Sequence, residues 1–270
     1  MAGPRPGSAY RVGGRASRAP AQPHDLIGPP VTTQQPVPTL VLDFDGTLCL
    51  GDDPVLLYAD ELAKRIDVDA GERLHAELTE FLAGTRRVEG AEDGYHAIWV
   101  LTQHLGLPRE VLAETYYASR ARMEAGEGSV HAPEGITELL DDVRGAGVRT
   151  VLVTNAPATG ATSWLATVGI AERLDAVVPD AGKPARMREH LETLLEQAGA
   201  TGSPHLLMSV GDVWVNDVEP AAAIGAHGLY IDRYGSGRGP STASAPTIGE
   251  LYPVIRAWAA DPAADLAARG

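Results

Sequence analysis

Short apolar segments recur along the chain from residue 39 onward. The first is Thr39-Leu40-Val41-Leu42-Asp43-Phe44, and the later ones span residues 148–153, 174–178, 205–210 and 229–231. Apolar runs of this length are typical of strands that are buried on both faces. Stretches with helical spacing separate the last four. The stretch at 133–144 starts with Pro133 and is followed by Gly145 and Gly147, as expected for a helix. This alternation predicts an α/β fold with a doubly wound parallel sheet.

Residues 51–132 show no strand pattern and are expected to form a separate helical unit. Their apolar residues recur at spacings of three and four in successive groups, which predicts four amphipathic helices. The groups are Val55, Tyr58, Leu62 and Ile66; Leu74, Leu78, Phe81 and Leu82; Tyr95, Ile98, Trp99, Thr102 and Leu105; and Val111, Leu112, Tyr116 and Met123. Turn residues at 51–54 and 126–129 suit hinges. We therefore expect a core formed by 38–50 and 133–260, with a helical cap at 51–132.

The two ends of the chain differ in composition from the part between them. Residues 1–37 hold four arginines against one acid, together with seven of the 20 prolines and a single aromatic residue. Such a segment buries too little apolar surface to offset its ordering entropy, so we expect a disordered basic tail. It lacks the apolar stretch of a signal peptide. Residues 261–270 are expected to form a short C-terminal tail.

Composition excludes several functional classes. The formal net charge is −14, so the chain repels the phosphates of nucleic acids and of anionic membranes. Cys49 is the one cysteine, which excludes an internal disulfide and a cysteine-based zinc site. No apolar run reaches the roughly 20 residues of a membrane-spanning helix. We expect a cytoplasmic protein whose partner is a small molecule.

Polar residues follow four of the predicted strands. They are Asp43, Asp45, Gly46 and Thr47 after the first; Thr154 and Asn155 after the second; Lys183 and Pro184 a few residues after the third; and Asp212, Asn216 and Asp217 after the fourth. Ligands of open α/β sheets bind at the carboxyl ends of the strands, so these side chains are expected to converge. Carboxylates held together repel one another, at about 4 kcal/mol per pair for about 4 Å and an effective dielectric constant of about 20. A divalent cation relieves that repulsion, and oxygen ligands favour Mg²⁺.

These residues resemble the four motifs of the haloacid dehalogenase superfamily. In chain order they are Asp43-Phe44-Asp45-Gly46-Thr47, Thr154-Asn155, Lys183-Pro184, and Gly211-Asp212 with Asp217. The resemblance covers about residues 38–260 and includes a helical cap inserted after the first motif. Asp45 indicates the phosphatase branch, because true dehalogenases lack an Asp two places after the nucleophile.

The resemblance implies a role for each motif residue. Asp43 would be the nucleophile that forms an aspartyl-phosphate, and Asp45 would serve as general acid and then general base. Magnesium would be held by Asp43, the Asp45 carbonyl, Asp212 and Asp217. Thr154 and Lys183 would bind phosphoryl oxygens, and Lys183 would also restrain Asp43. The remaining expected substrate-binding residues are Gly46, Thr47 and Asn155. The segment before Lys183 is shorter than in many relatives.

The leading hypothesis is a magnesium-dependent phosphatase that hydrolyses a small phosphorylated metabolite. A phosphomutase would share the first half-reaction, but it would return the phosphoryl group to a sugar instead of releasing inorganic phosphate. A non-catalytic binding or regulatory protein on the same fold is a third reading. Asp43 and Asp45 argue against it, because a binding protein needs no nucleophile beside an acid.

Overall fold

A six-stranded parallel sheet forms the centre of the molecule. The computed structural model describes residues 35–264, except for the side chains of 159 and 160. The strands are β1 (Thr39–Leu42), β2 (Arg149–Val153), β3 (Ala176–Val178), β4 (Leu207–Gly211), β5 (His227–Ile231) and β6 (Ala243–Ala245). Their order is β3-β2-β1-β4-β5-β6, and every neighbouring pair is parallel. The direction of winding therefore reverses between β1 and β4, and the predicted doubly wound α/β fold is confirmed.

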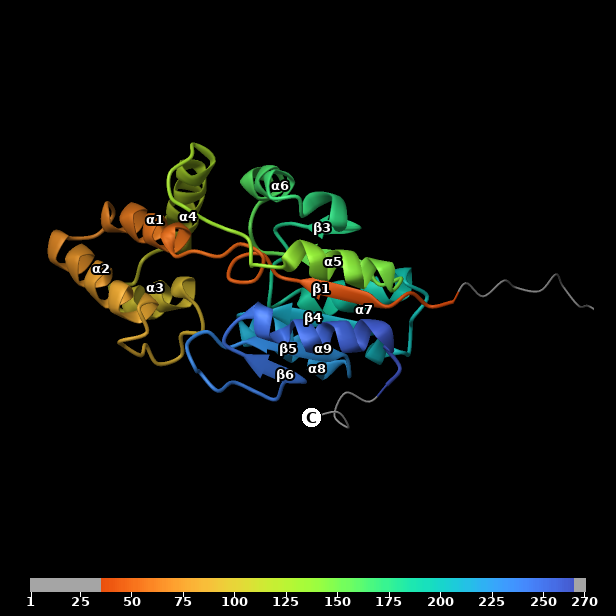
Figure 1. Ribbon diagram of the computed structural model, residues 1–270. Helices are drawn as coiled ribbons and strands as arrows, with labels where there is room; N and C mark the ends of the chain where they lie inside the picture. The colour runs from red at the N-terminus through yellow and green to blue at the C-terminus, as the bar shows by residue number, and fades with distance from the viewer. Residues whose placement is uncertain (1–34, 265–270) are drawn as a thin grey trace, which may run out of the picture. The chain divides into compact units, whose positions relative to one another are not determined.

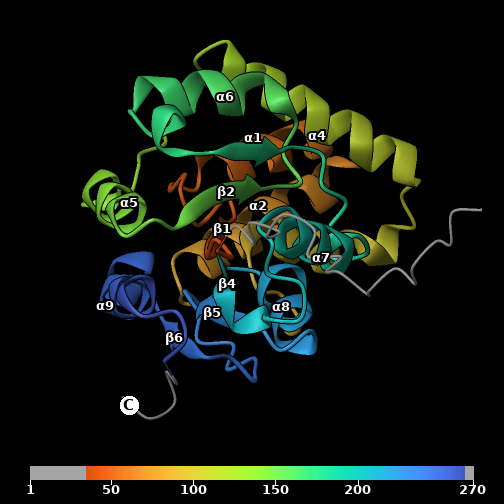
Figure 2. The same cartoon turned by 90° about the vertical axis from the view of Figure 1, so that its right-hand side faces the viewer.

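Helices cover both faces of this sheet (Figures 1 and 2). One face carries α5 (Ile136–Gly145), α6 (Ala158–Thr167) and α9 (Ile248–Ala260), and the other carries α7 (Met187–Gln197) and α8 (Glu219–Ala223). Successive strand residues point to opposite faces, so Leu40 and Leu42 join the first apolar cluster while Val41 joins the second. Burial on both faces explains why the strands read as apolar runs.

Four helices lie between β1 and α5, and we refer to them as the cap helices. They are α1 (Asp53–Ala63), α2 (Val68–Leu82), α3 (Gly94–Thr102) and α4 (Arg109–Glu124). Their apolar faces form a third cluster around Leu62, Leu78 and Ile98. Asp67 and Asp93 cap α2 and α3 by accepting from backbone N–H groups three residues further on. Trp99, expected on the apolar face, is instead 53% exposed.

The remaining elements are short. They are the 3₁₀ segments Gln103–Leu105, Ala171–Arg173 and Pro204–Leu206, and a π-helical turn at Trp214–Val218. The strand β6 was not predicted from the sequence. Within residues 35–264, no helix is both long and apolar enough to cross a membrane. Most of the predicted N-terminal tail, 1–37, and the last six residues of the predicted C-terminal tail lie outside the described residues.

The connections into and out of the cap helices run side by side. Leu50 and His131 form an antiparallel bridge, with N–H to carbonyl distances of 2.8 and 2.9 Å. Gly51 follows with φ +130°, and a Cβ there would lie 2.8 Å from the Ser129 carbonyl oxygen. The two connections therefore form one hydrogen-bonded ribbon. Position 51 of this ribbon must be glycine, because of its positive φ and the nearby Ser129 carbonyl.

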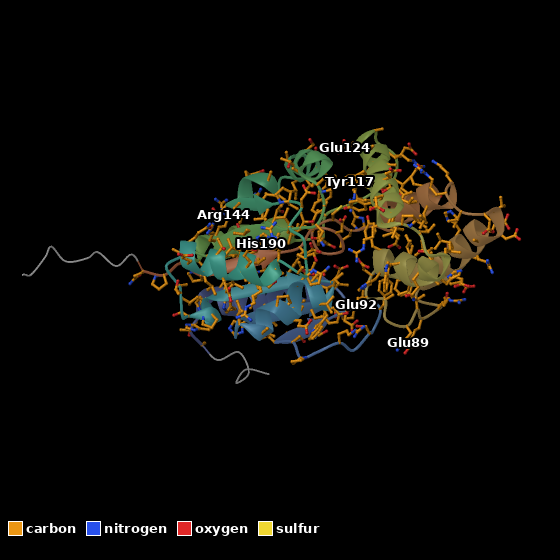
Figure 3. The ribbon with its side chains drawn as sticks, turned by 180° about the vertical axis from the view of Figure 1, so that it is seen from behind. Glu89, Glu92, Tyr117, Glu124, Arg144 and His190 are labelled. Atoms are coloured by element: carbon orange, nitrogen blue, oxygen red, sulfur yellow. The ribbon has the colours of Figure 1, made fainter. Side chains whose placement is uncertain are left out.

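The loop between β5 and β6, residues 232–242, packs on the cap helices. The Tyr234 ring stacks on Phe81 of α2, with centroids 4.4 Å apart, and Arg233 pairs with Asp52 at 2.7 Å. Glu92, between α2 and α3, accepts from the backbone N–H of Trp214 and lies 3.5 Å from Arg238. In Figure 3, Glu92 lies where its loop meets the core, whereas Glu89 of the same loop points outward. The cap helices thus contact the core through the β5–β6 loop and through Glu92, in addition to the ribbon at Leu50 and His131.

Candidate active site

The predicted site residues meet where the sheet reverses its winding. Asp43 directly follows β1 and Asp212 directly follows β4, and these two strands are neighbours. The π-helical turn after β4 brings Asp217 back toward them. One carboxylate oxygen from each of the three acids lies within 4.8 Å of the other two. The strand-end argument therefore located this cluster correctly.

Lys183 lies between two of these carboxylates. Its Nζ donates to Asp43 Oδ1 and to Asp217 Oδ1, each at 2.7 Å. The Lys183 side chain is 2% exposed, so both ion pairs are shielded from solvent. Asn155 fixes the Lys183 backbone: its Oδ1 accepts from the Lys183 N–H at 2.7 Å and its Nδ2 donates to the Lys183 carbonyl at 3.1 Å. The short segment before Lys183 is thus long enough to deliver the ammonium group to Asp43.

Burial shifts the ionisation of the cluster. It raises the pKa of Asp43 above its usual value, although Lys183 opposes the shift. Burial, reinforced by Asp93 and Asp43, raises the pKa of Asp212 well above its usual value. The Asp217 pKa rises to about 7, again through burial and against the pull of Lys183. One ammonium therefore does not neutralise three buried carboxylates.

These acids suit a divalent cation with oxygen ligands. Asp212 Oδ1 is buried and has no hydrogen-bond partner among the described residues. A buried carboxylate oxygen without a partner is costly unless a cation or water satisfies it. The donor set of Asp43, Asp212 and Asp217 consists only of carboxylate oxygens, which Mg²⁺ prefers to softer donors.

Two glycines let the carboxylates approach the backbone. A Cβ on Gly46 would lie 1.9 Å from Asp212 Oδ2, and the φ of Gly46 is +76°. A Cβ on Gly211 would lie 2.2 Å from Asp217 Oδ2. Gly46, an expected substrate-binding residue, donates its N–H to the Cys49 carbonyl at 3.0 Å. Gly46 therefore makes room for Asp212.

The two threonines of the predicted set lie in different surroundings. Thr154 is buried and borders the cavity, and its hydroxyl accepts from the Ala156 N–H at 3.0 Å. Thr47 is fully buried and is absent from the cavity lining, and its hydroxyl has no partner within residues 35–264. The structure thus brings Thr154, but not Thr47, to the cavity wall.

A cavity of about 470 Å³ is lined by Asp43 of the three-acid cluster, whereas Asp212 and Asp217 are not among its lining residues. Its floor includes Asp43, Asp45 and Lys183, and its cap side is lined by Tyr58, Asp93, Tyr95, His96, Tyr116 and Arg120. The carboxylate of Asp45 is paired with the Arg120 guanidinium of α4, with Nη1–Oδ1 at 3.2 Å. Burial raises the pKa of Asp93 to about 6, and the nearby charges of Asp43 and Asp45 add to the shift.

Sequence reasoning missed Arg120, Tyr95 and Asp93. Asp93 carried a usable signal, because Asp immediately before an apolar helical pattern is a common helix cap. Arg120 carried none, since it is one of three arginines within α4. The adjacent arginines Arg86 and Arg87, between α2 and α3, lie at the surface, and Arg86 pairs there with Glu77 and Glu80.

Comparisons with known proteins agree with this architecture. A profile of the haloacid dehalogenase-like hydrolases matches residues 37–225. A search of curated proteins gives no match. A proposed phosphoglycolate phosphatase of Lactobacillus plantarum aligns over 81% of this chain and 99% of its own, with 16% identity and a TM-score of 0.56.

Two further solved structures show the same fold. A proposed HAD hydrolase of Bacillus subtilis, solved bound to magnesium, aligns over 82% of this chain and 99% of its own, with 17% identity and a TM-score of 0.54. A proposed β-phosphoglucomutase of Thermotoga maritima aligns over the same shares, with 17% identity and a TM-score of 0.51. At these identities the likeness concerns the fold.

Proposed function

Because the chain belongs to the haloacid dehalogenase-like hydrolases, we propose that it is a magnesium-dependent phosphatase that hydrolyses a small phosphate monoester through Asp43. The observation that carries this proposal is the position of the Asp43 carboxylate. It borders the cavity, lies 2.7 Å from the Lys183 ammonium, and belongs to the three-acid cluster suited to a cation. A nucleophile beside two sources of positive charge is the arrangement that phosphoryl transfer requires.

In the proposed first step an oxygen of Asp43 attacks phosphorus as the bond from phosphorus to the ester oxygen breaks. Asp45 gives its proton to the departing oxygen, which leaves as an alcohol. Lys183 and Thr154 hold the phosphoryl oxygens. In the second step Asp45 takes a proton from water, and the resulting hydroxide attacks the aspartyl-phosphate and releases inorganic phosphate and free Asp43.

The proposed magnesium ligands are Asp43, Asp212, Asp217 and the backbone carbonyl of Asp45. When bound, the ion supplies positive charge that offsets the negative charge of the transferring phosphoryl group. Lys183 restrains Asp43 and contributes the same sign of charge from the protein. Asn155 acts through Lys183, because its amide is already hydrogen-bonded to both backbone groups of that residue.

The cavity limits what the enzyme accepts. A volume of about 470 Å³ beneath the cap helices suits a small metabolite and excludes a folded phosphoprotein. The net charge of −14 disfavours nucleic-acid substrates. We place the activity in the cytoplasm.

The replacement Asp43→Asn tests the nucleophile directly. It retains the shape of the side chain and removes the attacking oxygen, so phosphate release should fall at least about 10³-fold, or about 4 kcal/mol in barrier height. The measurement is inorganic phosphate released from a panel of monoesters, with magnesium and with EDTA. Asp69→Asn, on the exposed start of α2, is the control and should behave like wild type.

Two outcomes contradict the proposal. Retention of a tenth of wild-type turnover in Asp43→Asn rules out the aspartyl-phosphate route. Phosphoryl transfer to a sugar without release of inorganic phosphate identifies a phosphomutase instead.

A further inference from the structure

Arg120 is a cap residue whose charged group lies against the Asp45 carboxylate. Its side chain is 11% exposed, and its two terminal nitrogens contact the two carboxylate oxygens of Asp45 at 3.2 and 2.5 Å. Nη2 also donates to the Tyr95 hydroxyl at 2.9 Å. The guanidinium therefore holds a carboxylate in the two-pronged geometry that this group favours, at the cap side of the catalytic cavity.

Two aromatic rings fix the direction of this guanidinium. Its central carbon lies 5.6 Å from the Tyr95 ring centre and 5.1 Å from that of Tyr116. Such contacts attract a cation and reduce the freedom of a long side chain. Arg120 is thus held in position by residues of α3 and α4, independently of Asp45.

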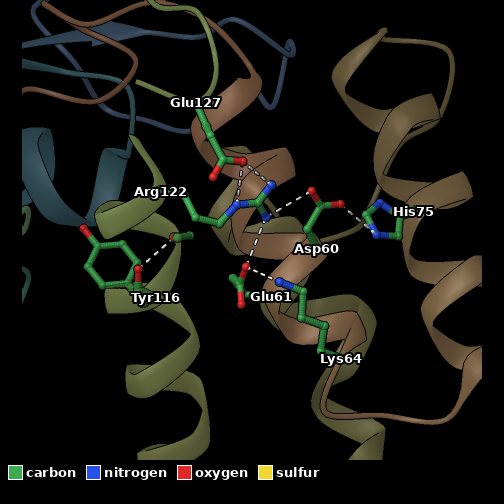
Figure 4. A network of polar contacts seen from close by, with 8 residues as sticks. Asp60, Glu61, Lys64, His75, Tyr116, Arg122 and Glu127 are labelled. Carbon is green, nitrogen blue, oxygen red and sulfur yellow. Dashed lines mark hydrogen bonds and ion pairs between the residues drawn. The ribbon is translucent and has the colours of Figure 1, made fainter. Parts of the chain in front are cut away.

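Arg120 lines the cavity, whereas Arg122 belongs to a partly exposed ion-pair network of the cap helices. Figure 4 shows Arg122, on the same helix, joined to Asp60, Glu61 and Glu127. These partners lie in α1 and just beyond α4, so Arg122 holds the cap helices together. Arg120 instead reaches across 75 residues of sequence to the catalytic loop. Arg122 therefore provides the ion pairs that join α4 to α1, and Arg120 does not contribute to them.

Polar atoms on the cap side of the cavity lack partners. Nε of Arg120 and Nδ1 of His96 are both buried and have no hydrogen bond within the described part of the chain. Both residues line the cavity. Arg120 Nε is a donor, whereas His96 Nδ1 donates or accepts according to its tautomer. Buried polar atoms are rarely left unsatisfied, so the Arg120 donor points to a ligand with an acceptor oxygen.

We propose that Arg120 is the specificity residue of this enzyme and binds a carboxylate carried by the leaving group of the substrate. The inference rests on the proposed phosphatase activity and names its substrate class. Asp45 occupies the carboxylate position when no substrate is present. When substrate binds, its carboxylate replaces Asp45 as the partner of the two terminal nitrogens of Arg120. Both Asp45 oxygens are then free to face the ester oxygen.

The geometry also limits the length of the leaving group. The ester oxygen must come within about 3 Å of Asp45 for proton transfer, and the carboxylate within about 3 Å of Arg120. Because Arg120 Nη1 and Asp45 Oδ1 are themselves 3.2 Å apart, the two substrate groups are separated by about 9 Å at most, which favours a phosphorylated hydroxy acid with a short carbon chain. A second phosphate suits this position less well, because Asp93 lines the same wall and a dianion is repelled more strongly.

Arg120 also borders a second, larger cavity of about 710 Å³. That cavity has apolar walls at Phe44, Met123 and Trp164. Arg120 and Ala156 line both cavities, so a charged guanidinium lies at the wall that the two cavities share. A cation at this wall favours an anionic leaving group over an apolar one.

A matched pair of substrates tests this inference. 3-Phosphoglycerate and glycerol 3-phosphate differ in carrying a carboxylate or a hydroxymethyl group at the same position. We expect wild type to favour the acid in kcat/KM by about 10- to 100-fold, the value of a charge-assisted hydrogen-bonded pair. Arg120→Gln should reduce this preference to about threefold or less. Arg120→Lys should restore part of it, because charge returns without the fork. Arg122→Gln is the control and should keep the wild-type ratio.

Three results would overturn the inference while leaving the phosphatase proposal intact. They are equal kcat/KM for the two substrates, a preference for the acid that survives in Arg120→Gln, and a preference for propane-1,3-diyl bisphosphate or 1-naphthyl phosphate over 3-phosphoglycerate.

Calorimetry separates the two proposals if no monoester is hydrolysed. That failure would overturn the phosphatase proposal. Binding of 3-phosphoglycerate in preference to glycerol 3-phosphate, lost in Arg120→Gln and kept in Arg122→Gln, would still support carboxylate recognition. Equal affinity for both would overturn it.

Discussion

Asp212 packs against the backbone so closely that the opposite residue must be glycine. The position of Gly46 has no space for a methyl group, and its positive φ is unfavourable for other residues. These two constraints are separable, because Gly84 has a similar φ of +70° but nothing within 4 Å of the position of a Cβ. A substitution at Gly84 therefore meets only the unfavourable backbone conformation. A substitution at Gly46 meets that conformation and also collides with the Asp212 carboxylate.

Gly46→Ala should therefore be more harmful than Gly84→Ala. The left-handed backbone costs either variant about 1–2 kcal/mol of unfolding free energy. Gly46→Ala must in addition displace the Asp212 carboxylate, so its response to magnesium should largely disappear. Thermal melts with magnesium and with EDTA provide the measurement. An equal magnesium response in both variants would show that Asp212 does not depend on Gly46.

The predictability of individual residues depends on what positions them. Asp43, Asp212 and Lys183 follow strands, and a parallel sheet brings its strand ends together whatever the details of packing. Arg120 lies on a cap helix, and its orientation depends on how that helix docks over the sheet. Helical periodicity identifies the face that a residue occupies, but not which distant carboxylate it meets. The convergence of the strand-end residues was therefore predictable from the sequence, and the contribution of the cap helices to the cavity was not.

The β5–β6 loop contacts both the cap and the core. Its sequence, rich in glycine and serine, favours interpretation as a flexible connection, yet Tyr234 and Arg233 both contact cap-side residues. An aromatic pair contributes about 0.5–1.5 kcal/mol beyond the area that it buries. The Tyr234–Phe81 contact is thus a substantial part of the attachment of α2 to the core.

Tyr234→Ala should loosen the cap helices without altering the arrangement of Asp43, Lys183 and Asp212. We expect a loss of about 1–2 kcal/mol in unfolding free energy and faster amide hydrogen exchange in α2 around Phe81. Exchange in the strand β1 should be unaffected beyond the global loss. Tyr117→Ala is the control, because Tyr117 lies on α4 with 55% of its surface exposed (Figure 3). Unchanged exchange in α2 would mean that the ribbon alone holds the cap helices.

Elements were predictable where the sequence carried a local apolar signal. The five strands were predicted from short apolar runs, and the four cap helices from apolar residues spaced three and four apart. The strand β6 has the sequence Ala-Ser-Ala and is defined by its hydrogen bonds to β5, so no local signal exists. Trp99 fits the helical pattern of α3, yet no other element covers it. The exposure of Trp99 depends on tertiary packing, which the spacing of apolar residues does not reveal.

The charge of the whole site couples stability to pH. A carboxyl whose pKa is higher in the folded than in the unfolded chain binds more protons when folded. Its contribution to stability therefore declines as the pH rises between the two values. For Asp217 this interval runs from the usual 3.8 to about 7. The raised pKa values of Asp43 and Asp212 act in the same direction.

In EDTA the protein should consequently lose thermal stability between about pH 5 and about pH 7, within the interval set by Asp217. Asp217→Asn should show a smaller loss, because the amide does not titrate. Saturating magnesium should reverse the trend for wild type, since the ion binds the ionised carboxylates of the folded state, and should add about 2.7 kcal/mol at 100 times its dissociation constant. Melting temperatures across this range test the prediction. Stability that rises with pH in EDTA would contradict it.

The bridge between Leu50 and His131 makes the cap helices an exchangeable module. The chain leaves the core and returns to it at one hydrogen-bonded pair, Leu50 and His131. In topology, the whole helical insertion is therefore a long loop closed by this pair. The entropy of closing such a loop grows only slowly with its length. Insertions of other lengths, or a short turn, could join the same two residues without moving the sheet. The side of the cavity that the cap helices line, Arg120 included, can therefore diverge while Asp43, Lys183 and the other acids stay unchanged.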